Sequence, residues 1–203
     1  MGGIIHTTAT AMRQWHLPVS HGRRVLAWGL VALMPLLGPL AVGQSAVTDL
    51  LGALNLSNYP SGMRPPAFKS RTAAGQTVAL ADLRGRVVLL TFWTTWCAEC
   101  RPEMPLFESL HRDFAAQGLT VLGVNVREGT GAIAQYAQAL GVTFPLVVDQ
   151  QGSITTAYGV IGLPTTFLIG RDGRTVALAT GPREWGSAPA RALIQALLAE
   201  STK

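Results

Sequence analysis

The stretch VVLLTFWTTWCAECRPE, residues 87–103, contains an apolar run followed closely by two cysteines. Val87–Leu90 is apolar without interruption, which is typical of a strand buried on both faces of a sheet. Cys97 and Cys100 follow this strand, and Pro102–Gln117 then has apolar residues at helical spacing. We therefore predict a buried strand, a helix, and a connection that places both cysteines at the start of the helix.

Cys97 and Cys100 are the only cysteines among the 203 residues, so any thiol chemistry belongs to this pair. The amide dipoles at a helix N-terminus favour the thiolate form of Cys97. Cys100, expected three residues into the helix, would lie within reach of the Cys97 sulfur and be more enclosed. Dithiol–disulfide exchange requires an exposed attacking thiol and a shielded resolving thiol, so the pair predicts redox activity.

Two cysteines at this spacing can also serve purposes other than exchange. A purely structural disulfide would close a short loop and gain little chain entropy. Structural zinc needs four ligands, and outside the N-terminal segment the only histidine is His111, about 16 Å along the helix. A thiol peroxidase is suggested by Thr94, three residues before Cys97, but the proline and arginine that such a site needs are lacking. A Cu(I)-binding or metal-delivery module that uses both thiolates remains the alternative function.

Strands and helices alternate over residues 61–203, which we expect to form one domain. We predict strands at 77–80, 86–93, 119–126, 144–148, 166–169 and 175–179, and helices at 102–117, 132–140, 153–158 and 187–200. This order predicts an α/β fold whose central sheet is covered by helices on both faces. Asp172-Gly173 is a hairpin signal, so the sheet is expected to be mixed rather than all-parallel.

The first 43 residues have the composition of a signal peptide or a membrane anchor. Val25–Gly43 is nineteen residues long, and fourteen of them are apolar. Basic residues precede this run, and the small residues Ala41-Val42-Gly43 end it, so cleavage after Gly43 is expected. An uncleaved anchor needs about twenty apolar residues, which this run nearly supplies. Residues 44–60 are then a spacer, with a short helix at 47–54.

The net charge of +5 at pH 7 could indicate a nucleic-acid partner. Three of the sixteen basic residues, Arg13, Arg23 and Arg24, lie in the first 48 residues, which contain no acid. Residues 49–203 keep thirteen basic and eleven acidic residues, a net charge of +2. The basic balance is therefore interpreted as a targeting signal, and no nucleic-acid partner is expected.

Val87–Cys100 resembles the active-site strand and turn of the thioredoxin superfamily. Within it, the chain is similar to the exported thioredoxin-like family that includes TlpA, ResA and the cytochrome c maturation thioredoxins. Ala67–Trp93 resembles the N-terminal hairpin and first core strand of that family. Val124–Val126 and the helix that follows resemble its central insertion. Gly162–Ile169 resembles its cis-proline loop and the next strand. The implied fold is the thioredoxin fold, with an N-terminal β-hairpin and a central insertion.

The resemblance assigns catalytic roles to three residues. It implies that Cys97 is the nucleophile and that Cys100 is the resolving thiol. The family has an active-site glutamate at the position of Glu103, and burial would raise its pKa so that it could take the proton of Cys100. Cytoplasmic thioredoxins carry a buried aspartate where this chain has Thr91, which strengthens the expectation for Glu103.

Three further residues are expected to bind the partner protein. Pro164 would be the cis-proline that faces the cysteines, and Leu163 would offer its backbone to an extended substrate. Trp96, next to the nucleophile, is expected to form part of the docking surface.

Glu99, between the cysteines, is expected to make the pair more reducing than a histidine there would. Trp185 is expected to be a packing residue.

The function that this resemblance implies is an extracytoplasmic thiol–disulfide oxidoreductase without cofactor or metal. It would reduce disulfides in periplasmic partner proteins, during cytochrome c maturation or oxidase assembly. Because the periplasm is oxidising, such a reductase needs an upstream membrane dithiol as electron donor. The protein is expected to be periplasmic, either soluble after signal cleavage or anchored to the inner membrane through residues 25–43.

Overall fold

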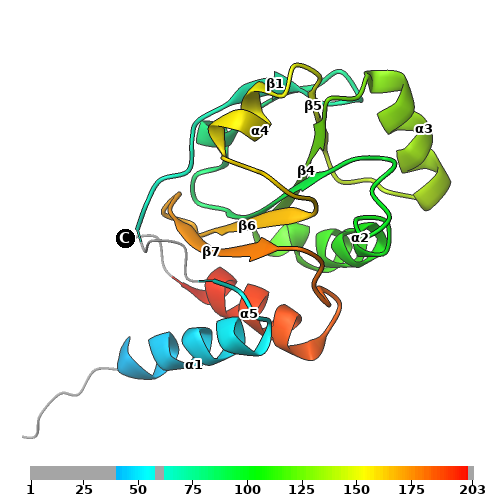
Figure 1. The fold of residues 1–203 in the computed structure, drawn as a ribbon. Helices are drawn as coiled ribbons and strands as arrows, with labels where there is room; N and C mark the ends of the chain where they lie inside the picture. Colours follow the sequence, from blue (N-terminus) through cyan, green and yellow to red (C-terminus); the bar gives the residue numbers. More distant parts are fainter. Residues whose placement is uncertain (1–39, 58–61, 201–203) are drawn as a thin grey trace, which may run out of the picture. The chain divides into compact units, whose positions relative to one another are not determined.

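The computed structural model describes residues 40–57 and 62–200 (Figure 1). All of these residues belong to one compact unit. Most of the predicted signal or anchor, residues 1–39, lies outside the described residues. Within 40–57 and 62–200, no helix is long and apolar enough to cross a membrane.

A five-stranded mixed sheet forms the centre of the domain, in the order β5-β4-β3-β6-β7. The strands are β3 (Val87–Trp93), β4 (Leu119–Val126), β5 (Leu146–Asp149), β6 (Thr165–Ile169) and β7 (Thr175–Thr180). β3 pairs parallel with β4 and antiparallel with β6, and β6 pairs antiparallel with β7. The mixed sheet and the closing hairpin are therefore as predicted. All seven residues of β3 are buried, as the apolar run indicated.

Helices cover both faces of this sheet (Figure 1). On one face, α2 (Glu103–Phe114), α3 (Thr130–Leu140) and α5 (Ala188–Ala199) share an apolar core with Val87 and Leu89. On the other face, α4 (Ser153–Ala157) packs with Val88, Leu90 and Phe92. Alternate residues of β3 thus belong to two different cores, because successive strand side chains point to opposite faces.

An N-terminal hairpin precedes the central sheet, as the family resemblance implied. β1 (Lys69–Arg71) and β2 (Thr77–Ala79) pair antiparallel as a separate two-stranded sheet. The residue pattern alone predicted only the second of these strands, because Lys-Ser-Arg has no apolar residue to mark a strand. A short 3-10 helix, η1 (Leu80–Leu83), follows β2.

The helix expected at 47–54 is longer at its N-terminal end. α1 spans Leu40–Ala53, so the predicted cleavage point after Gly43 lies within its bounds. Leu51 and Leu54 are buried in the same core as α5, and the two helices are in contact. Residues 51–56 of the expected spacer therefore pack against the domain. Their apolar residues at helical spacing account for this, because they can be buried only against a neighbouring element.

Candidate active site

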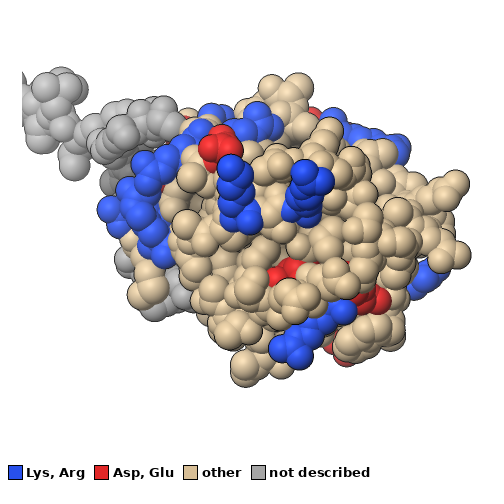
Figure 2. All heavy atoms as spheres, turned by 90° about the horizontal axis from the view of Figure 1, so that it is seen from above, with Lys and Arg blue, Asp and Glu red and all other residues tan. Residues whose placement is uncertain are grey.

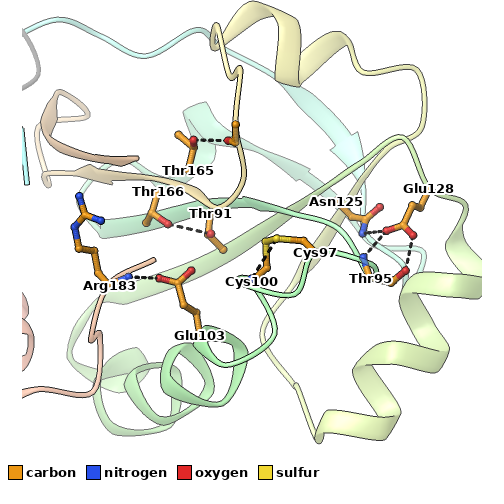
Figure 3. Close-up of a disulfide and its surroundings, with 11 residues drawn as sticks. Thr91, Thr95, Cys97, Cys100, Glu103, Asn125, Glu128, Thr165, Thr166 and Arg183 are labelled. Atoms are coloured by element: carbon orange, nitrogen blue, oxygen red, sulfur yellow. Dashed lines mark hydrogen bonds between the residues drawn. A yellow bond between two sulfur atoms is a disulfide. The ribbon is translucent and has the colours of Figure 1, made fainter. Parts of the chain in front are cut away.

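The turn between β3 and α2 carries a disulfide between Cys97 and Cys100, whose Cα atoms are 5.3 Å apart (Figure 3). The backbone N–H of Cys100 donates a hydrogen bond to the Cys97 sulfur at 3.2 Å. The prediction that Cys100 lies three residues into the helix is wrong, because α2 begins at Glu103. Pro102 precedes the first helical residue, and a proline is tolerated at a helix start but not in its interior.

The two sulfur-bearing residues differ in exposure, although less than expected. Cys97 is 8% exposed and Cys100 only 1%. A groove of about 590 Å³ is lined by Cys97 and not by Cys100. The expected difference between an accessible and a shielded cysteine is therefore present, but Cys97 is reached through the groove and does not stand out on the surface.

The groove brings together segments that are far apart in the sequence. Its lining comes from the active-site turn (residues 96–99), the end of β4 (126–127), α4 (155–156) and the loop before β6 (160–163). Two large apolar side chains of this lining are strongly exposed, Trp96 at 74% and Ile161 at 99%. Exposed apolar side chains beside a reactive group are typical of a surface that binds another protein.

The structure brings the predicted partner-binding residues to this groove only in part. Trp96 and Leu163 line it, whereas Pro164 is buried and is not part of its lining. The Leu163–Pro164 peptide bond is cis. Ile161 was not among the predicted residues, because one apolar residue in a loop has no periodicity to single it out.

Glu103, the first residue of α2, is only 2% exposed. Its Oε1 atom accepts hydrogen bonds from the backbone N–H of Arg183 and from the indole N–H of Trp185, both at 2.8 Å. Its Oε2 atom is buried and has no hydrogen-bond partner among the described residues. Burial raises the pKa of this carboxyl from 4.5 to about 7, although the bonds from Arg183 and Trp185 oppose the rise. The raised pKa is as predicted.

Thr91 occupies the strand position where cytoplasmic thioredoxins carry an aspartate. It is 1% exposed, and its hydroxyl accepts a hydrogen bond at 3.0 Å from the hydroxyl of Thr166 on β6 (Figure 3). This pair of hydroxyls cannot take up a proton at neutral pH. Glu103, at the start of α2, is therefore the buried carboxyl group that this site offers.

Glu128 is a site residue that the sequence did not single out. It follows β4, and its carboxylate accepts hydrogen bonds from the backbone N–H (2.8 Å) and the hydroxyl (2.5 Å) of Thr95. The side-chain amide of Asn125 donates a third bond at 2.7 Å (Figure 3). Glu128 thus ties the turn before Cys97 to the end of the neighbouring strand. An acid just beyond an apolar strand was the only available signal.

We expect Glu128→Gln to destabilise the oxidised protein by about 2 kcal/mol, because hydrogen bonds to a charged acceptor are lost. The NH2 group of a glutamine at this position would also face the N–H groups of Thr95 and Asn125, which are donors themselves. Urea unfolding of the oxidised protein measures the loss, and amide hydrogen exchange at Thr95 should become faster. Glu99→Gln, at the exposed acid between the cysteines, is the matched control and should leave both quantities unchanged. Equal effects of the two substitutions would contradict this role of Glu128.

Charged side chains do not form one continuous surface on the face of the molecule seen in Figure 2. On the face seen in Figure 2, Lys and Arg side chains are separated by broad uncharged surface, with one group at the left edge. Within residues 40–57 and 62–200, no three His, Cys, Asp or Glu side chains gather where they could hold a metal ion.

The chain is similar to known proteins in sequence. Residues 62–177, more than half of its length, match the model of the AhpC/TSA family. The thiol-disulfide oxidoreductase ResA of Geobacillus thermodenitrificans is 41% identical over 120 residues, which cover 59% of this chain and 69% of that protein. The ResA of Bacillus subtilis is 38% identical over 120 residues, which cover 59% of this chain and 67% of that protein.

Solved structures of similar proteins have the same fold. A putative thiol:disulfide interchange protein DsbE from Chlorobium tepidum has a TM-score of 0.63 and 31% identity, covering 70% of this chain and 99% of that one. StoA from Bacillus subtilis has a TM-score of 0.54 and 27% identity, covering 65% of this chain and 96% of that one. The family match over residues 62–177 includes the groove, the two cysteines and the loop with the cis peptide bond.

Proposed function

This chain belongs to the AhpC/TSA family and is a thiol–disulfide oxidoreductase with a thioredoxin-like fold, and on that premise we propose that it reduces disulfides in partner proteins outside the cytoplasm. One observation carries the proposal: Cys97 lines a groove rimmed by exposed apolar side chains, whereas Cys100, bonded to it, is shielded.

The reduced protein would act in two exchange steps. The Cys97 thiolate attacks one sulfur of the partner disulfide, so that a Cys97–partner disulfide forms and the other partner sulfur leaves as a thiolate. Cys100 then attacks the Cys97 sulfur, which closes the Cys97–Cys100 disulfide and releases the second partner thiolate. Two electrons pass from the protein to the partner, and both partner thiolates take up protons. An upstream dithiol must then reduce the Cys97–Cys100 disulfide.

Glu103 is proposed as the base for the second step. Cys100 must lose its proton before it can attack, and it is too enclosed to give that proton directly to bulk water. The Glu103 carboxyl begins the helix three residues later, and its pKa of about 7 suits a group that exchanges protons near neutral pH. Its Oε2 atom, which has no partner among the described residues, is free to receive the proton.

The groove is proposed as the docking surface for the partner, with Trp96 as its main apolar contact. We expect Trp96→Ala to raise KM for a protein disulfide about tenfold with little change in kcat, because a contact made equally in the ground and transition states is lost. Steady-state reduction of a folded disulfide-containing substrate gives both constants.

Met63→Ala is the matched control for Trp96→Ala, since Met63 is also a large exposed apolar side chain, at 50%, and does not line the groove. It should leave KM unchanged. If both substitutions raise KM equally, the groove is not the docking surface.

The substrate class that we propose is an exported protein with two nearby cysteines oxidised to a disulfide, such as the haem-attachment cysteines of an apocytochrome c or the cysteines of a copper-binding assembly protein. The relatives' names support disulfide exchange and do not specify a partner. The test mixes the reduced domain with an oxidised Cys-x-x-Cys-His peptide. Release of two peptide thiols for each Cys97–Cys100 disulfide formed supports the proposal. Tight stoichiometric Cu(I) binding without exchange would favour the alternative metal-delivery function.

Export by residues 1–43 is proposed from their composition, with residues 25–43 either removed as a signal or retained as an anchor. Fusion of residues 1–60 to a reporter enzyme that needs disulfides for activity tests this export. An active reporter is expected, and replacement of Val25–Gly43 by a polar stretch should inactivate it. A reporter that stays inactive in the cytoplasm would refute the proposed location.

A further inference from the structure

Trp185 has a contact that its sequence context did not indicate. It lies between β7 and α5, is 1% exposed and packs its ring on Phe107 of α2, with ring centroids 5.6 Å apart. These contacts agree with a packing role. Its indole N–H, however, donates a 2.8 Å hydrogen bond to Oε1 of Glu103, across 82 positions of the sequence. A residue expected only to fill space thus touches the proposed proton acceptor.

The loop that carries Trp185 is fixed by hydrogen bonds at several points. The N–H of Gly181 donates to the carbonyl of Pro164 at 2.8 Å. The guanidinium of Arg183 donates to the carbonyl of Asn55, just after α1, at 2.9 Å. The Ser187 hydroxyl accepts from the N–H of Ala190 and caps α5. The loop is therefore held against three separate parts of the domain, and its donors toward Glu103 are pre-organised.

Both donors of this loop reach the same oxygen of Glu103. The Arg183 N–H, drawn in Figure 3, and the Trp185 indole N–H both donate to Oε1. Oε2 is buried without a hydrogen-bond partner among the described residues. A carboxyl group anchored through one oxygen cannot rotate without breaking two hydrogen bonds. Its second oxygen is thereby the one left to exchange a proton.

We propose that Trp185 is a positioning residue for thiol–disulfide exchange, because its indole N–H fixes Oε1 of Glu103 and so leaves Oε2 to accept the proton of Cys100. This proposal rests on the role proposed above for Glu103. The charged groups that act on Glu103 are Arg183 and Glu184, both in the same loop, and the ionisable residues nearest in sequence are Arg101, Cys100 and Glu99.

Loss of the indole N–H has a predictable sign. Hydrogen bonds to the carboxylate favour its charged form, so they oppose the effect of burial on the Glu103 pKa. Trp185→Phe should therefore raise this pKa further and move the pH–rate profile of exchange to higher pH. At pH 7 the exchange rate should fall about fivefold, which is the loss typical of one hydrogen bond, and it should recover as the pH is raised.

Trp93→Phe is the matched control. Trp93 is also fully buried, at 0% exposed, but its indole nitrogen has no hydrogen-bond partner among the described residues. The two substitutions remove the same atoms from the core, and only one removes a bond to Glu103. Exchange rates with a small-molecule disulfide are measured from pH 5 to 9 for wild type, Trp185→Phe, Trp93→Phe and Glu103→Gln.

The proposal predicts a profile shifted to higher pH for Trp185→Phe, an unshifted profile for Trp93→Phe and a flattened one for Glu103→Gln. If Glu103→Gln flattens the profile while Trp185→Phe leaves it in place, the positioning role of Trp185 is refuted and the role of Glu103 stands. If Glu103→Gln leaves the profile unchanged, both roles are refuted.

A measurement on the unaltered protein covers the case in which Trp185→Phe does not fold. The indole N–H resonance of Trp185 should titrate with the midpoint of the wild-type rate profile, because its acceptor changes charge there. The resonance of Trp93 should not follow that midpoint. A Trp185 resonance that is independent of pH between 5 and 9 would overturn the proposal.

Discussion

Cys97→Ser is expected to lower the rate at which the reduced domain cleaves a protein disulfide by at least about a thousandfold. A serine hydroxyl stays protonated at neutral pH and is a far weaker nucleophile than a thiolate, and the chain has no third cysteine to replace it. Cys100, at 1% exposed and outside the groove lining, is too enclosed to attack a partner in its place. Turnover of a folded disulfide substrate by the two variants, followed by release of free thiol, measures the effect.

Cys100→Ser is the appropriate control, because both variants lose the same internal disulfide and therefore the same constraint on the chain. It should block turnover but keep the first step, at a rate within about threefold of wild type. Retention of full activity by Cys97→Ser, or an equal loss of the first step in both variants, would contradict the assignment of Cys97 as nucleophile.

Glu103→Gln is expected to change how stability depends on pH. In the oxidised protein the cysteines do not titrate, so they add nothing to the slope near neutrality. The folded-state pKa of Glu103, about 7, lies above its ordinary value of 4.5. The folded protein therefore holds this proton more tightly than the unfolded chain. The resulting stabilisation is fully present below about pH 4.5 and is lost as the pH rises through about 7.

The size of this loss follows from the two pKa values. Each unit of pKa corresponds to about 1.4 kcal/mol, so the oxidised wild type should lose about 3 kcal/mol between pH 4.5 and 8 through Glu103. Glu103→Gln keeps an uncharged side chain of similar shape, so that part of the loss should vanish. Urea unfolding of both oxidised proteins at intervals of half a pH unit gives the comparison.

Glu108→Gln is a control at a second buried carboxyl of α2, at 5% exposed. Burial acts to raise the pKa of Glu108, but hydrogen bonds from Thr143 and Arg112 outweigh it and lower the pKa. Its contribution to stability is present above its ordinary pKa of 4.5 and lost only below that value. Glu108→Gln should therefore leave the slope between pH 5 and 8 as in wild type. An unchanged slope in Glu103→Gln would mean that its carboxyl is already ionised in the folded protein.

Local patterns in the sequence predicted much of this fold. The apolar run at 87–90 is a strand buried on both faces, and Asp172-Gly173 closes a hairpin in a mixed sheet. The cis peptide bond before Pro164 followed from family resemblance and not from any pattern, since a sequence does not reveal a peptide isomer. The start of α2 was placed too early, because the apolar stripe gives a helix face but not its first residue.

The contacts around the site could not be predicted in the same way. Glu128 reaches Thr95 across 33 positions, and Trp185 reaches Glu103 across 82. Such hydrogen bonds depend on how strands and loops meet in space, and no spacing in one sequence encodes them. The same holds for α1, which was expected only as a short helix within a spacer, with no indication that it packs against α5.

Trapping of the mixed disulfide tests the central claim most directly, namely that Cys97 is the attacking thiol of an exchange pair. Reduced Cys100→Ser is mixed with a disulfide-containing protein substrate, quenched with acid and digested, and the linked peptides are identified by mass spectrometry. The account predicts that a covalent complex accumulates and that the substrate is attached at Cys97, whereas Cys97→Ser treated in the same way yields none. Efficient formation of a complex through Cys100 in Cys97→Ser would contradict it.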